Sequence, residues 1–96
     1  MSLTHYCIVK SGLSKGVTCA MLCHAAGDSS PGNLPPDTRV VALESKDIGD
    51  IAKRLEDRSI PHHLVEEDGE LLAIGLEPAL ELDQIKRVTS SLPLIR

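Results

Sequence analysis

The first part of the chain passes from a strand-like to a helix-like pattern of apolar residues. Residues 4–9 form a short apolar run with β-branched side chains, which predicts a buried strand. A polar loop over residues 10–14 follows, and Ser14 at its end is a typical helix N-cap. From Lys15 to about Gly27 the apolar residues recur at helical spacing, which predicts a helix. The recurring residues are Val17, Ala20, Met21 and Ala25.

A proline-rich loop separates this helix from a second strand and a second helix. Residues 28–37 hold three prolines together with a glycine and an asparagine, which is typical of a loop. Residues 39–43 are mostly apolar and β-branched and predict a strand. Ser45 is the expected N-cap of the second helix, whose apolar residues follow the i, i+3, i+4, i+7 pattern. These residues are Ile48, Ile51, Ala52 and Leu55.

The last third of the chain predicts a β-hairpin followed by a third helix. Residues 62–67 and 70–76 each have the composition of a strand. Asp68-Gly69 lies between them and predicts a tight turn in which both central residues have a positive φ. Residues 82–90 then place three apolar side chains on one face of a helix. These side chains belong to Leu82, Ile85 and Val88.

The resulting order, β-α-β-α-β-β-α, predicts one α/β domain over residues 1–96. The two crossover helices imply that the first three strands run in the same direction with right-handed connections. The tight turn reverses only the fourth strand, so we expect a mixed four-stranded sheet between helices, a three-layer αβα arrangement. Ligand sites in such sheets form at the carboxyl ends of the parallel strands. That rule brings the loop over residues 10–14 near the end of the third strand.

Composition and charge narrow the class of protein. Tyr6 is the only aromatic residue, so the core is aliphatic, and no apolar run is long enough to span a membrane. Three cysteines cannot all pair with one another, and the chain shows no signal segment. We therefore expect free, buried thiols in a reducing cytoplasm. The net charge is −4, with the densest acidic run at residues 66–70, and no basic stripe typical of nucleic-acid binders is present.

The start of the first predicted helix is a candidate anion site. Lys10 and Lys15 flank it, and Gly16 allows the backbone to approach a ligand closely. The first N–H groups of a helix, which follow Ser14 here, lack intrahelical partners and attract negative charge. The alternative is that both lysines are ordinary exposed loop residues. The Gly-Lys-Ser/Thr order of a phosphate-binding P-loop is absent.

Asp68 and the histidines each have a structural and a functional interpretation. Asp68 either serves the turn alone or also orients a water molecule. His24 is either packed against the first helix's apolar face or part of a site. His62 and His63 point to opposite faces of their strand, so they do not form a joint metal site. The cysteines show no standard zinc spacing, and we expect no metal.

Residues 14–26, Ser-Lys-Gly-Val-Thr-Cys-Ala-Met-Leu-Cys-His-Ala-Ala, resemble the type II peptidyl-tRNA hydrolases of archaea and eukaryotes. That family opens with a strand, Gly-Lys-Gly-Lys, and a helix carrying Ala-Gln-Cys-x-His-Ala. Residues 73–78, Ala-Ile-Gly-Leu-Glu-Pro, are similar to the family's fourth-strand motif Gly-Ile-Gly-Pro-x-Pro. The resemblance also runs through the second and third helices, so it covers most of the chain and implies the family's fold.

The resemblance places the family's functional positions on particular residues. Lys15 and Gly16 match the first Lys-Gly of the motif, His24 matches its histidine, and Asp68 matches the catalytic aspartate. The second motif lysine, which the family uses in catalysis, is replaced by Val17. The threonine-bearing stretch after the aspartate is missing, because Glu70 begins the next strand at once. The chain is thus a shortened and divergent match.

The resemblance implies hydrolysis of the ester bond between a peptidyl or aminoacyl group and tRNA, by a cytoplasmic homodimer without metal or organic cofactor. Asp68 would then position the water, Lys15 or helix amides would stabilise the oxyanion, and His24 would belong to the site. Lys10, Ser14 and Gly16 would bind the ligand. We expect weak tRNA binding, because the acidic run repels phosphate.

Two other functions stay open. The departures at Val17 and after Asp68 favour a non-catalytic binding or assembly module that keeps the fold. A hydrolase of a smaller anionic ester is the third hypothesis. The surface around Lys15 distinguishes the first two, because a basic cleft would favour tRNA and an acidic or filled one would favour the module.

Overall fold

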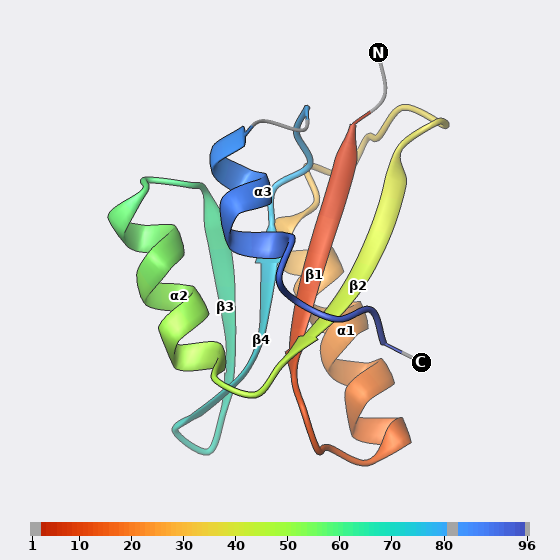
Figure 1. Cartoon of the computed structure of the whole chain (residues 1–96). Helices are drawn as coiled ribbons and strands as arrows, with labels where there is room; N and C mark the ends of the chain where they lie inside the picture. The colour runs from red at the N-terminus through yellow and green to blue at the C-terminus, as the bar shows by residue number, and fades with distance from the viewer. Residues whose placement is uncertain (1–2, 81–82, 96) are drawn as a thin grey trace.

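The computed structural model describes residues 3–80 and 83–95 (Figure 1). Its elements follow the predicted order β-α-β-α-β-β-α. They are β1 (Thr4–Lys10), α1 (Lys15–Ser29), β2 (Arg39–Ser45), α2 (Ile48–Asp57), β3 (His62–Glu67), β4 (Glu70–Leu76) and α3 (Asp83–Thr89). The predicted start of the third helix at Leu82 lies outside the described residues. In the described part of the chain, no helix has the length and hydrophobicity needed to cross a membrane.

The four strands form one mixed sheet in the order β2-β1-β4-β3. β1 and β2 are parallel and pair over seven residues, from Thr4 opposite Arg39 to Lys10 opposite Ser45. β4 is antiparallel to both β1 and β3. β1, β2 and β3 therefore run in one direction and β4 alone is reversed, which confirms the predicted strand directions.

Helices cover both faces of the sheet, α1 on one face and α2 with α3 on the other (Figure 1). Alternate strand residues point to opposite faces, so each face has its own apolar cluster. Ile8 and Ile74 belong to the cluster under α2 and α3. Val9 and Ala73 belong to the cluster under α1. The predicted αβα layering is therefore present.

β4 carries one extra residue relative to β3. Val65 lies opposite Ala73, but the next residue, Glu66, lies opposite Leu71. Leu72 is therefore the inserted residue of a β-bulge. Leu72 and its neighbour Ala73 both pack in the cluster under α1, so β4 contributes two consecutive side chains to that face.

α1 packs closely on β4 because Gly75 has no side chain. A Cβ atom at Gly75 would lie 2.3 Å from the carbonyl oxygen of Ala25 and 2.4 Å from Ser29 Oγ. Ser29 is buried and its hydroxyl donates to that carbonyl oxygen at 2.6 Å. The Nε2 atom of buried His5 lies 2.7 Å from Ser29 Oγ and must be the donor, since the hydroxyl hydrogen is already used. Burial lowers the pKa of His5, which favours the neutral ring.

The predicted apolar face of the first helix is partly wrong. Met21 and Ala25 are buried, but Ala20 is exposed and the Val17 side chain is 41 % exposed. The first turn of α1 extends past the ends of β1 and β2, where the sheet no longer covers it (Figure 1). The prediction of buried cysteines is correct for Cys7 and wrong for Cys19 and Cys23, because α1 buries only a narrow face. Burial raises the pKa of the Cys7 thiol to about 11.

The predicted N-cap of the second helix is also wrong. Asp47 caps α2, and its carboxylate accepts a hydrogen bond from Asp50 N at 3.2 Å. Ser45 is instead the last residue of β2, paired with Lys10, and its hydroxyl oxygen accepts from Asp47 N. Both residue types are good caps, and the longer β2 strand decides between them.

Candidate functional site

A hollow of about 410 Å³ lies at the carboxyl ends of β1 and β2, beside the first turn of α1. We call it the α1-start hollow. This is the end of the sheet where the strand-end rule places ligand sites. Its lining residues are Lys10, Gly12, Leu13, Lys15, Thr18, Cys19, Leu22, Glu44 and Ile95.

The loop between β1 and α1 has a defined conformation. Ser11 N donates to Ser45 O at 2.9 Å and extends the pairing of β1 with β2. Gly12 has φ +86°, a conformation that favours glycine and that turns the chain toward the helix. Ser14 then caps α1, because its hydroxyl oxygen accepts from Val17 N at 3.3 Å. The earlier N–H groups of the helix, those of Lys15 and Gly16, have no intrahelical acceptor and are available to a ligand.

The charged side chains of the hollow include both signs. Lys10 and Lys15 supply two cations, and Glu44 supplies a carboxylate. The Lys10 ammonium also forms an ion pair with the Glu70 carboxylate, which joins the end of β1 to the first residue of β4. The local charge is therefore close to balanced, and the hollow is not the broad basic surface that a tRNA backbone needs.

An apolar wall stands beside these charges. Leu13, Leu22 and Ile95 pack against the buried cluster under α1 and also line the hollow. Thr18 and Cys19 add a hydroxyl and a thiol from α1. The hollow is therefore amphipathic and suits a ligand that carries a polar or anionic group next to an apolar one.

Two of the four residues predicted to form an anion site line the hollow. Lys10 and Lys15 line the hollow, Ser14 caps the helix above it, and Gly16 is exposed with open space around its Cα. Ser14 and Gly16 are neighbours of this hollow in the sequence but are not among its lining residues.

Asp68 lies in the predicted tight turn and outside the lining of the hollow. Asp68 and Gly69 have φ values of 53° and 78°, as a two-residue hairpin turn of this type requires. The turn is at the same end of the sheet as the hollow, because Glu70 beside it contacts Lys10. Asp68 is not among the residues that line the hollow.

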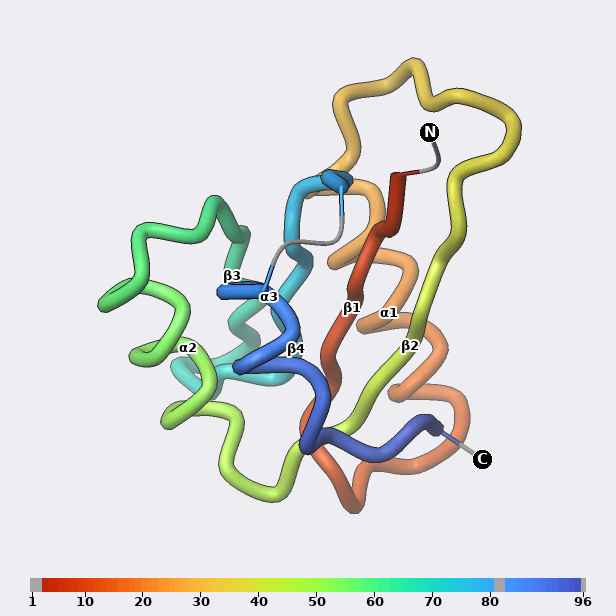
Figure 2. Tube along the Cα trace, turned by 45° about the horizontal axis from the view of Figure 1, so that its top comes forward, coloured from red at the N-terminus to blue at the C-terminus, as the bar shows by residue number. Residues whose placement is uncertain are grey.

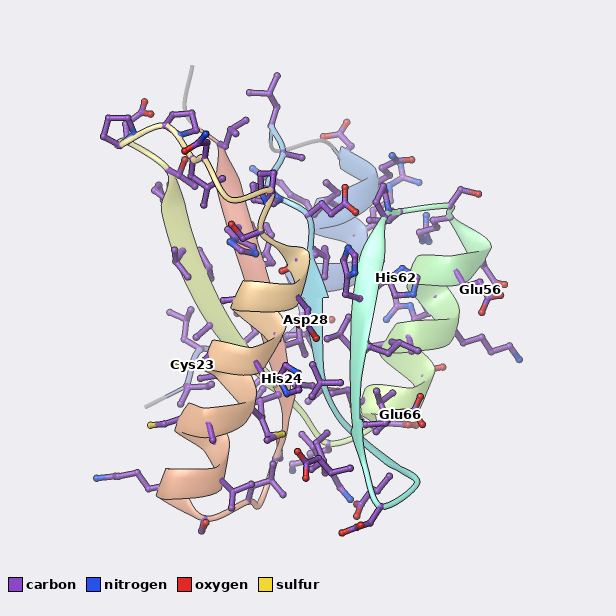
Figure 3. The ribbon with its side chains drawn as sticks, turned by 180° about the vertical axis from the view of Figure 1, so that it is seen from behind. Cys23, His24, Asp28, Glu56, His62 and Glu66 are labelled. Atoms are coloured by element: carbon purple, nitrogen blue, oxygen red, sulfur yellow. The ribbon has the colours of Figure 1, made fainter. Side chains whose placement is uncertain are left out.

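His24 is separated from the hollow along α1. It lies nine residues after Lys15, which corresponds to roughly 14 Å along a helix axis. The side chain is 50 % exposed, and its Nε2 atom lies 3.3 Å from a carboxylate oxygen of Asp28. Figure 3 shows both side chains along the same side of α1. The three residues expected to act in catalysis are therefore not assembled around one point.

A second hollow, of about 330 Å³, lies at the other end of α1. Asp28, Ser29, His63 and Glu77 are among its lining residues, and His63 Nε2 lies 2.9 Å from a Glu77 carboxylate oxygen. Within residues 3–80 and 83–95, no set of three or more histidine, cysteine or acidic side chains is placed to hold a metal ion.

Sequence reasoning missed several residues of the α1-start hollow. The strand-end rule could have identified Glu44, because this residue precedes the last residue of a parallel strand. Thr18 and Cys19 could also have been predicted to line a site at the start of α1, because they lie in the first turns of that helix. Ile95 had no local signal, because its place depends on contacts with β2.

No protein-family model and no curated protein sequence matches this chain.

Proposed function

We propose that the protein is a divergent relative of the type II peptidyl-tRNA hydrolases, and that the α1-start hollow receives the acyl end of a peptidyl- or aminoacyl-tRNA. The observation that supports this proposal is the presence of Lys10 and Lys15 in one hollow with an apolar wall, beside the first turn of α1. An acylated amino acid esterified to tRNA has polar carbonyl groups, and where its side chain is apolar it matches both parts. The motif similarity over residues 14–26 concerns the same helix.

The hollow contains groups that suit the hydrolysis of an ester. Water attacks the ester carbonyl carbon, and negative charge develops on the carbonyl oxygen. The Lys15 ammonium and the N–H groups of Lys15 and Gly16 stabilise that charge. A carboxylate accepts the proton of the attacking water, and the 3′ oxygen of the tRNA leaves with a proton. In this proposal the carboxylate is either Glu44, which lines the hollow, or Asp68, which the resemblance implies.

Hydrolysis is slow in this proposal because of position 17. Val17 stands where the family has its second lysine, and it is exposed and does not line the hollow. Lys15 is already the first residue of α1 and points about 200° away from position 17 around the helix, so it does not replace that lysine. Loss of one such donor costs about 10²–10³ in rate. The protein is therefore at least about a hundredfold slower than a typical family member.

A second candidate function is a non-catalytic binding or assembly module. The positions of Asp68, outside the hollow, and of His24, paired with Asp28, favour it. In that case the hollow holds an acylated amino acid or a similar anion without cleaving it.

The resemblance also supports a cytoplasmic location and a homodimer. The apolar side chains of Val40 and Leu64 are 64 % and 45 % exposed, but they lie on the opposite edge strands β2 and β3 and form no common patch, so self-association is supported by the resemblance alone. Sedimentation at several concentrations measures it. A monomer at every concentration would contradict the homodimer.

A single-turnover assay with N-acetyl-aminoacyl-tRNA tests the proposal. We expect release above a heat-inactivated control, and a fall of at least about tenfold in Lys15→Ala and in Glu44→Gln. Lys46→Ala is the matched control, because Lys46 is exposed and does not line the hollow. Binding without release would favour the binding module, and neither binding nor release would contradict both functions.

A further inference from the structure

The C-terminal segment from Pro93 to Ile95 is laid along β2 and forms part of the α1-start hollow. Glu44 N donates to Pro93 O at 3.0 Å, and Ile95 N donates to Ala42 O at 3.2 Å. Leu94 forms an antiparallel bridge with Leu43 between these two hydrogen bonds. Figure 2 shows the segment passing β2 toward the start of α1. The backbone of the segment is therefore fixed by the same strand that supplies Glu44.

This pairing sets the directions of the side chains. In an extended segment, neighbouring side chains point to opposite sides. Ile95 packs with the cluster under α1 and lines the hollow. Leu94 instead lies on the opposite face of the sheet, beside Tyr6 and Leu43 from the strands and Thr89 from α3. Only Ile95 of this pair can contact a ligand in the hollow.

We propose that Ile95 is a specificity-determining residue, and that the α1-start hollow selects acylated amino acids whose side chain is apolar. The inference rests on the proposed function, because it takes the acyl end of a tRNA ester as the ligand. Ile95 forms the apolar wall with Leu13 and Leu22, next to the cations Lys10 and Lys15. A ligand whose carbonyl or carboxylate oxygens face the lysines places its side chain against that wall.

The chemistry of the wall decides which side chains are accepted. An apolar side chain removes its own surface and that of Ile95 from water, which favours binding. A polar side chain of the same shape would lose its hydrogen bonds with water and gain none from three aliphatic neighbours. The volume of about 410 Å³ is at the small end of the range for ligand sites, so a side chain bound inside the hollow lies close to the wall. We expect discrimination of about tenfold or more between leucine and asparagine derivatives.

The test measures binding of N-acetyl-leucine and N-acetyl-asparagine to the full chain, followed by the amide NMR signals of Thr18 and Cys19. Leucine and asparagine side chains have nearly the same shape, so the pair isolates polarity. We expect N-acetyl-leucine to bind at least about tenfold more tightly. Ile95→Thr should reduce the preference to less than about threefold, while Ile95→Val and Leu94→Thr should retain it. An unchanged amide spectrum outside the hollow shows that each variant keeps the fold.

Equal affinities of the wild type for the two probes would overturn the inference, as would binding of neither probe or a preference unchanged in Ile95→Thr. These outcomes are separable from failure of the proposed function. Hydrolysis of acyl-tRNA without any side-chain preference would contradict the role of Ile95 alone. A leucine preference that depends on Ile95, with no hydrolysis of tRNA esters, would contradict the hydrolase alone.

Discussion

At the scale of single residues, the buried pair of His5 and Ser29 makes stability depend on pH. His5 is neutral in the folded protein because burial lowers its pKa, whereas in the unfolded chain it titrates near 6.5. Below that pH the unfolded chain takes up a proton that the folded protein does not, so unfolding becomes easier. The contribution of the neutral His5 ring to the free energy of unfolding is complete above pH 6.5. It decreases by up to about 1.4 kcal/mol per pH unit as the pH falls toward the pKa of His5 in the folded protein.

Urea unfolding of the wild type and His5→Gln between pH 7.5 and 5 measures this contribution, over a range of about 2.5 pH units that begins above the pKa of the unfolded chain. The other histidines are common to both proteins, so the difference between the two free energies isolates His5. The difference should shrink as the pH falls. A difference independent of pH would contradict the buried neutral ring.

Position 17 gives a second prediction for a single residue. Val17→Lys should raise the rate of peptidyl-tRNA hydrolysis by less than about tenfold, because the threonine-bearing stretch is also absent. The valine is 41 % exposed, so the change should leave the melting temperature within about 2 °C. Ala20→Lys, also exposed on α1, is the control for added charge. A gain of a hundredfold in Val17→Lys alone would show that one lysine is all the site lacks.

At the scale of elements, the close contact of α1 with β4 depends on Gly75. Gly75→Ala should lower the free energy of unfolding by at least about 2 kcal/mol, since the new Cβ meets backbone and a buried serine. Gly27→Ala is the matched control within α1, where nothing lies within 4 Å of the added atom. It should gain about 0.5 kcal/mol through helix propensity. Equal changes in the free energy of unfolding for Gly75→Ala and Gly27→Ala, measured by chemical denaturation, would contradict the close packing of α1 on β4.

The elements also show what the sequence could predict. The periodic apolar residues of α2 and the Asp68-Gly69 turn depend on local pattern and are found as expected. The exposed side of α1 depends on where the sheet ends, and the cap at Asp47 depends on how far β2 extends. Both features are set by tertiary structure and not by the local sequence. The same division applies to the site. Lys10 and Lys15 follow from the strand-end rule, but Ile95 reaches the hollow only through pairing with β2.

At the scale of the whole molecule, charge limits the contact with tRNA. Glu66, Glu67 and Glu70 lie around the hairpin at the same end of the sheet as the hollow. We expect no submicromolar tRNA binding at physiological salt. With two lysines meeting a single-stranded end, the slope of log affinity against log salt should be about −1.4. A mobility assay over a salt series measures both, and tight binding with a steep slope would contradict the expectation.

The Pro93–Ile95 segment also occupies hydrogen-bonding groups that an edge strand otherwise offers to another chain. Exposed edges act as templates for intermolecular strand addition and for cross-β aggregation. On β2, Ala42 O and Glu44 N are already paired with the segment. On β3, the other edge, Glu66 and Glu67 carry negative charge that disfavours an incoming strand. Around Ala42–Glu44 of β2 and at the acidic end of β3, the pairing of two copies into one continuous sheet is therefore disfavoured.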